Sequence, residues 1–234
     1  METIDDIRRA AFELRATDPQ EAVRVLRQAA AQGGEAEVLA RGALGEIYLE
    51  EFGDLDGAEH EFRRVLQLAP GLPAAELGLA RTLREAGDFR AAEATFERAL
   101  HGLQKDLQRF REGELPAGAE EVVLTALEVA IELAELRAAS AHDKNVSVPL
   151  DEELLRWAAE QRLFDAEGDH DDWVRFHALW TQLRLLTGRA EEALTELREA
   201  ERAGLIPAAE SARLIGLARE TLGLPRLVTL GKKD

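Results

Sequence analysis

Apolar residues recur at three- and four-residue spacing over most of this chain, which is the pattern of helices with one buried face. β-branched residues are few and never alternate with polar ones, so no strand is predicted. Pro19, Pro73, Pro149 and Pro207 stand at or just before the starts of apolar runs, where a missing amide hydrogen is tolerated. The pattern predicts an all-α chain with helices near 2–16, 19–32, 35–52, 54–69, 73–86, 88–112, 118–141, 150–167, 169–187, 189–203 and 207–222.

Two of these segments repeat one another at an offset of 34 residues, from position 53 to position 87. A third copy begins at Gly188 and continues through Ala193 to Leu197, and a weaker one runs from Asp18 to Ala29. Self-similarity at a fixed period indicates one supersecondary unit that is stacked several times. The identities shared by the first two copies are Gly53 with Gly87, Asp54 with Asp88, Ala58 with Ala92, Glu59 with Glu93, and Phe62 with Phe96.

This pattern resembles the tetratricopeptide repeat family, whose unit of about 34 residues folds as two antiparallel helices. In that reading the Gly ends the first helix in a left-handed turn and the Asp caps the second. Leu44-Gly45 followed by Tyr48 resembles the family's first-helix motif, and Pro70 closes the repeat. The chain departs from the family in two places. One additional residue precedes Gly53, and the stretch from Leu103 to Asp169 carries no repeat signature.

The resemblance implies an all-α, right-handed superhelix of antiparallel helix pairs. We predict an N-terminal repeat block at 1–112, a degenerate helical block at 113–168, and a C-terminal repeat block with a terminal helix at 169–223. A tail covers 224–234. The blocks are expected to pack as one continuous solenoid, since each repeat contacts only its neighbours.

In this family the first helices line a concave groove that binds a partner. Chaperone-binding members hold a peptide carboxylate with Lys and Asn, but Gly42 and Glu46 stand at the corresponding positions here. Arg81 and Arg84 are the strongest anion-binding pair, because guanidinium groups suit carboxylates; the alternative is that they are ordinary solvated arginines. The resemblance implies partner-binding positions at Leu39, Glu46, Leu49, Glu50, Leu77, Arg81, Arg84 and Glu85.

The net charge of −17 and the absence of cysteine narrow the classes of function. An acidic surface repels phosphate backbones and anionic lipid, so neither nucleic acid nor membrane is an expected partner. Without cysteine there are no disulfides and no thiolate chemistry. No secretory leader and no membrane-spanning run is apparent, so a cytoplasmic location is expected.

The predicted helix 118–141 is apolar over most of its circumference, with a narrow polar stripe at Glu121, Thr125, Glu128, Glu132 and Glu135. Such a helix must be covered on several sides. Two explanations fit the pattern. The helix is buried at the junction of two repeat blocks, or it forms a protein interface, for instance in a homodimer.

Neither a metal site nor a catalytic group emerges from the sequence. The acidic stretch Asp165–Asp172 lacks the Gly and Glu that a calcium loop needs at its sixth and twelfth positions, and we interpret it as a solvated turn. His177 stands among aromatic residues, as a packed core histidine does. The chain contains no HExxH segment and no Gly-rich phosphate loop.

We therefore expect a protein–protein interaction adaptor or scaffold that binds a peptide or helix of a partner in the groove. The alternative is a structural homo-oligomer joined through the apolar middle helix or the terminal helix. We expect no enzyme activity, no cofactor and no metal.

Overall fold

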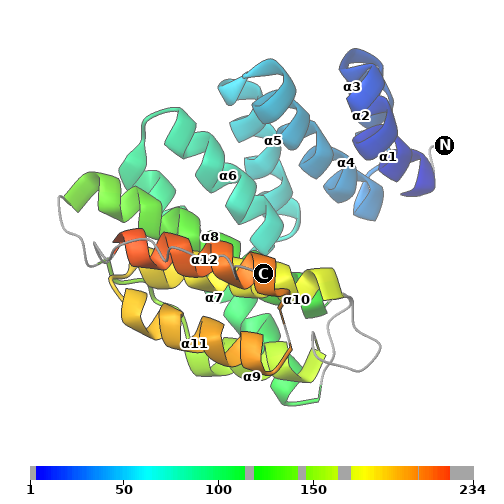
Figure 1. The fold of residues 1–234 in the computed structure, drawn as a ribbon. Coiled ribbons are helices and arrows are strands. Elements are labelled where there is room, and N and C mark those ends of the chain that lie inside the picture. The colour runs from blue at the N-terminus through cyan, green and yellow to red at the C-terminus, as the bar shows by residue number, and fades with distance from the viewer. Residues whose placement is uncertain (1–3, 114–118, 142–145, 163–169, 205, 222–234) are drawn as a thin grey trace. The chain divides into compact units, whose positions relative to one another are not determined.

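The computed structural model describes residues 4–113, 119–141, 146–162, 170–204 and 206–221. All regular elements within these ranges are helices, as predicted (Figure 1). Their bounds are α1 Ile4–Arg9, η1 Ala10–Leu14, α2 Arg15–Thr17, α3 Pro19–Ala30, α4 Gly34–Ile47, η2 Tyr48–Phe52, α5 Leu55–Leu68, α6 Pro73–Glu85, α7 Phe89–Arg111, α8 Ala119–Ala141, α9 Glu152–Arg162, α10 His170–Leu186, α11 Ala190–Arg202 and α12 Ala208–Thr221.

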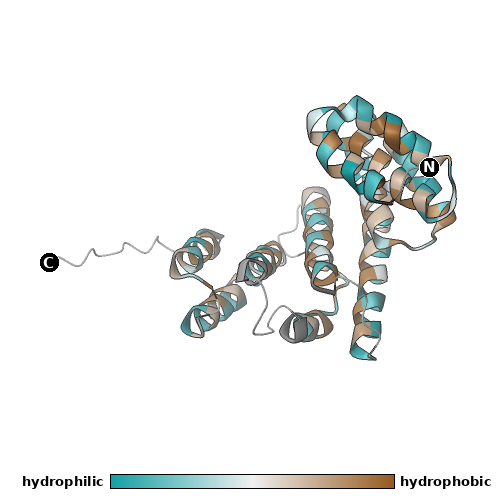
Figure 2. Ribbon diagram, turned by 90° about the vertical axis from the view of Figure 1, so that its right-hand side faces the viewer, coloured by the Kyte–Doolittle hydropathy of each residue, from teal (hydrophilic) through white to brown (hydrophobic). Residues whose placement is uncertain are grey.

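The chain forms two compact units, Met1–Gly102 and Leu103–Asp234, and the long helix α7 contributes to both. In the first unit α4 packs against α3 on one side and α5 on the other, and α5 packs against α6. Figure 2 shows both apolar and polar residues along the helices, and at helical spacing this leaves the amphipathic ones with one apolar face for packing. The division into three blocks and the stacking of all helices in one solenoid stay predictions.

The predicted turn between the two helices of a repeat is confirmed. Gly53 and Gly87 adopt positive φ angles of 61° and 82°, a backbone conformation that glycine adopts without steric cost. The carboxylate of Asp54 then accepts the backbone N–H of Gly57, and Asp88 accepts that of Ala91 in the same way. Local sequence alone therefore ends one helix and begins the next.

The Phe62 ring is the main packing element of the first unit. It projects from α5 and is 2% exposed. On α4, a Cβ added at Gly45 would lie 2.8 Å from this ring, and on α6 a Cβ added at Gly78 would lie 2.3 Å from it. Both glycines allow the backbones of their helices to approach the ring more closely than any other residue would. One aromatic side chain thus holds three helices from two successive repeats.

The additional residue before Gly53 is accommodated inside the first helix of its repeat. Residues Tyr48–Phe52 form a single π-helical turn, η2, which continues α4. The N–H of Gly53 donates to the carbonyl of Tyr48, five residues earlier, and closes this wide turn. A π turn holds one more residue than an α turn, so the insertion widens the helix and leaves the glycine–aspartate turn unchanged.

In the second unit, helix α8 is buried against α9 and α10. Its apolar residues Leu127 and Ile131 are 0% and 5% exposed. Even its polar stripe is used within the chain, because Glu128 pairs with Arg175 of α10 at 2.6 Å. The residues that would form a dimer interface on this helix are already covered in a single chain, so the structure gives no support to self-association through them.

We predict that Gly78→Ala lowers the free energy of unfolding by about 1–3 kcal/mol, because the added methyl group overlaps the Phe62 ring. Gly42→Ala is the matched control in α4, since its Cβ would meet no atom within 4 Å. That change should stabilise the protein by up to about 1 kcal/mol through helix propensity. Urea unfolding of the two variants measures both values, and equal stabilisation by both would contradict the packing role of Gly78.

Candidate functional site

The side chains named by the sequence lie on two consecutive first helices of the first unit. Leu39 and Glu46 belong to α4, while Leu49 and Glu50 belong to the π turn η2 that continues it. The remaining four are on α6, which α4 also contacts. Among the apolar candidates Leu39 is 40% exposed, but Leu77 is only 8% exposed. Leu77 faces the core, whereas an apolar residue that anchors a partner has to be accessible at the surface.

Arg15 of α2 brings the acidic candidates together. Its Nη1 lies 3.4 Å from Glu46, its Nε donates to Glu51 at 2.9 Å, and its Nη2 donates to Glu50. The Arg15 side chain is 20% exposed, whereas those of Glu46 and Glu50 are 58% and 52% exposed. Partial burial acts to lower the pKa of Arg15, yet this pKa is raised, because Glu51 and Glu50 bond the guanidinium and Glu46 adds its charge.

Of the two basic candidates on α6, Arg81 acts on one of these carboxylates. Partial burial raises the pKa of Glu46, and the positive charges of Arg15 and Arg81 oppose that rise. Arg81 on α6 therefore acts on the same carboxylate as Arg15 on α2. Arg84 lies 3.6 Å from Glu85 and stands 5.9 Å from the centre of the Phe96 ring. Arg84 thus contacts residues of its own repeat, whereas Arg81 acts on the preceding one.

Sequence reasoning missed Arg15 and Glu51. Arg15 stands on the least regular of the four repeats, 36 residues before Glu51. The sequence did contain one indication that Glu51 differs from the family pattern, namely the additional residue before Gly53. The π turn that absorbs this residue brings the fourth and fifth residues after Glu46 to the same side of the helix.

The second unit contains a separate ionic network around Arg184 of α10. The Arg184 side chain is 5% exposed and pairs with Glu152, Glu192 and Glu196 at 3.3, 2.5 and 3.1 Å. Its guanidinium also stands 5.0 Å from the centre of the Trp180 ring. Burial of a guanidinium requires such pairing, because an unpaired charge in this environment would be costly. The network joins α9, α10 and α11.

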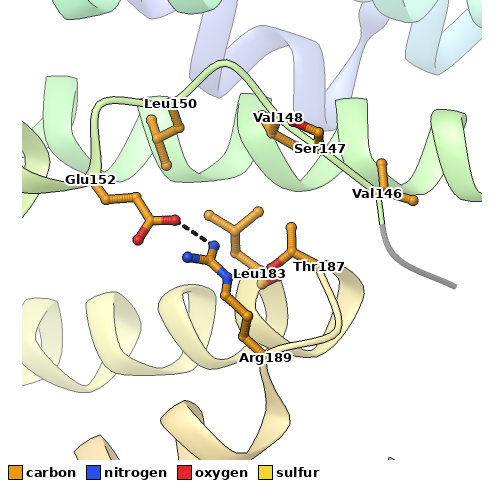
Figure 3. Close-up of a pocket in the computed structure, with 8 residues that line it drawn as sticks. All are labelled: Val146, Ser147, Val148, Leu150, Glu152, Leu183, Thr187 and Arg189. Atoms are coloured by element: carbon orange, nitrogen blue, oxygen red, sulfur yellow. Dashed lines mark hydrogen bonds and ion pairs between the residues drawn. The ribbon is translucent and has the colours of Figure 1, made fainter.

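A cavity of about 250 Å³ lies beside this network (Figure 3). Four of its eight lining residues are aliphatic and the other four are polar or charged, among them the ion pair of Glu152 with Arg189. Because these two charges neutralise one another, the cavity offers a ligand no net charge. No residue of the cavity was singled out from the sequence. Its lining is Val146, Ser147, Val148, Leu150, Glu152, Leu183, Thr187 and Arg189.

Metal binding and membrane spanning can be assessed only for the residues that the structure describes. Among the residues that the structure describes, no group of three or more His, Asp or Glu side chains is placed to hold a metal ion. Residues 165–169 of the acidic stretch lie outside the described residues, so its assignment as a solvated turn stays a prediction. None of the described helices has the length and the apolar run that crossing a bilayer needs.

Comparison with known proteins identifies the repeat. A family model described as tetratricopeptide repeat matches residues 51–112, which include the Gly53 and Gly87 turns and the Ala58 and Ala92 helices. Residues 51–112 therefore form a tetratricopeptide repeat segment. Such repeats mediate contacts between proteins, which makes a protein partner the expected ligand of this chain.

Solved structures and curated proteins add little to this tetratricopeptide repeat assignment. The chain is similar over 95% of its length to a structure of the assembly chaperone of RpL4 (Acl4, residues 1–338), of which 97% is covered. Sequence identity is 19% and the TM-score is 0.34. A resemblance at this level does not bear on what the present repeats bind. No curated protein matches the chain.

The stability of the protein should fall as the pH drops from 6.5 to 4. Burial lowers the pKa of His177 in α10 to about 4, while the charge of Glu196 opposes this shift. In that window the unfolded chain binds a proton that the folded chain does not, so folding loses on the order of 2 kcal/mol. Above pH 6.5 both states are neutral at this residue and the loss vanishes.

Urea unfolding at several pH values measures this loss. His177→Gln should remove the part of the pH dependence of stability that His177 causes, and leave the part that the carboxylates cause. His101→Gln is the control, because His101 is exposed on α7. Curves for wild type and His177→Gln that run parallel between pH 7 and 4.5 would contradict the assignment.

Proposed function

We propose that this protein is an interaction adaptor whose first unit binds a basic, amphipathic segment of a partner protein along α2, α4 and α6. The observation that carries the proposal is the pair of partly exposed carboxylates of Glu46 and Glu50, which lie on α4 and its continuation η2, the first helix of one repeat. In tetratricopeptide repeats such first helices line the concave side. We assign no chemical reaction to the chain, and a cytoplasmic location stays a prediction from the sequence.

Charge and apolar contacts would make different contributions to recognition of the partner. The net charge of −17 attracts a basic segment over long range and speeds its association at low salt. Leu39 and Leu49 are partly exposed on the same helices as the carboxylates, so they can contact the apolar side of an amphipathic segment. Leu77 is left out of the proposed surface because it is buried.

Arg81, Arg84 and Glu85 complete the proposed surface on α6. The Arg84 side chain is 30% exposed, and the Glu85 side chain is 58% exposed. An acidic residue within an otherwise basic segment would find its counter-charge here. This arrangement, with carboxylates on η2 and guanidinium groups on α6, would set the direction in which a segment lies across the two repeats.

Glu50→Lys should weaken binding of a basic amphipathic peptide at least about tenfold, because it replaces attraction by repulsion on the proposed surface. The probe is a synthetic 18-residue helix of lysine, arginine and leucine, and fluorescence anisotropy measures its binding. Glu59→Lys on the second helix α5 is the matched control, since Glu59 also pairs with an arginine, at 2.7 Å. Equal losses in both variants would show that only overall charge matters.

Arg84→Glu tests the α6 side of the surface. A version of the peptide that carries one aspartate should bind this variant more weakly than wild type, whereas Arg63→Glu should leave its affinity unchanged. Arg63 is exposed on α5 and pairs only locally with Glu59 among the ion pairs identified. Circular dichroism confirms that helicity is retained. If Arg63→Glu caused the loss and Arg84→Glu did not, the assignment of the binding surface to the first helices would be wrong.

A further inference from the structure

The guanidinium of Arg15 is already bound where the proposed partner's charge would bind. Three carboxylates surround it, from Glu46 on α4 and from Glu50 and Glu51 on η2. We call these three residues with their carboxylates the acidic triad. Arg15 itself comes from the preceding repeat, so this contact crosses from one first helix to the next.

The π turn creates the acidic triad. In a regular α-helix, residues four apart share a face, which accounts for Glu46 and Glu50. Residues five apart share a face only where the helix widens to a π turn, and η2 provides that widening for Glu51. The one-residue insertion in this repeat therefore adds a third carboxylate to a pair that could already bind one cation.

The acidic triad carries more negative charge than Arg15 neutralises. Three carboxylates face the one guanidinium of Arg15, and the positive charge of Arg81 also acts on Glu46. The side chains of Glu46, Glu50 and Glu51 are 58%, 52% and 35% exposed. The carboxylates are the more exposed side of these ion pairs, and exchanging one guanidinium for another replaces each contact by one of the same kind.

We propose that Arg15 is an internal competitor, which occupies the acidic triad in the free protein and yields it to an arginine of the bound partner. This inference rests on the proposed function and names the partner side chain. An arginine fits better than a lysine, because its planar fork can engage several carboxylate oxygens at once, as the Nε, Nη1 and Nη2 groups of Arg15 do. Competition with Arg15 would hold back weakly basic ligands and select for segments that offer further contacts.

Arg15→Gln removes the competitor and keeps the acidic triad. Arg24→Gln is the matched control, because it removes the same charge from the same unit. Arg24 pairs with Glu21 three residues earlier on the second helix α3, away from the triad. Circular dichroism and thermal melts establish that both variants are folded before binding is measured.

The experiment uses an 18-residue arginine–leucine amphipathic peptide and fluorescence anisotropy at constant ionic strength. We expect Arg15→Gln to bind the peptide about five- to tenfold more tightly than wild type, and Arg24→Gln to stay within about twofold of wild type. Adding Glu50→Gln and Glu51→Gln to Arg15→Gln should abolish the gain, because the vacated carboxylates are then absent.

The other outcomes separate the two proposals. If wild type binds the peptide but Arg15→Gln binds equally or less tightly, the competitor role is overturned while the proposed function stands. Equal gains in Arg15→Gln and Arg24→Gln would also overturn it, since overall charge would then explain the effect. Failure of every folded variant to bind the peptide would overturn both proposals.

Discussion

Contact between the Phe62 ring and two glycines organises the first unit. The ring stands on α5, and Gly45 of α4 and Gly78 of α6 bring their helix backbones against it. Once these distances are set, the two first helices are neighbours, and their exposed side chains must lie on adjacent strips of surface. The proposed surface depends on this spacing, because Glu46 and Arg81 can act on one another only when α4 and α6 are close. A packing contact in the interior thus determines which charges meet outside.

The two units use arginine in different ways. In the first unit the Arg15 guanidinium lies at a surface where its three carboxylate partners remain partly exposed. In the second, Arg184 is almost completely buried and its partners hold three helices together. Exposed pairs exchange readily, whereas breaking a buried pair leaves an unpaired charge in a poorly solvated place. The proposed recognition surface is therefore assigned to the first unit, and the buried network of the second unit joins its helices.

Repeated residues made most of the helices predictable, since a 34-residue offset specifies the turns, the caps and the small residues together. The pairing of Arg15 with the acidic triad was not predictable in this way. It depends on how a widened turn rotates Glu50 and Glu51, and helical spacing does not describe such a turn. The polar stripe of α8 left its partners undetermined, because helical spacing does not reveal that Glu128 pairs with Arg175 of α10. Burial of Leu77 likewise depends on tertiary packing that a repeat register does not resolve.

The start of α11 has consequences for the order in which the chain folds. Asp18, Asp54 and Asp88 each cap their helix through an N–H only three residues ahead, so α3, α5 and α7 can begin from local sequence. Arg189 stands at the corresponding place before α11, and its side chain reaches Glu152 of α9 instead. This helix gains its terminal contact only after residues 37 positions apart have met. We therefore expect α11 to acquire amide protection later during refolding than α5, which pulsed hydrogen exchange would record. Repeats of one kind would then differ in whether their helices form early from local sequence or late from tertiary contacts.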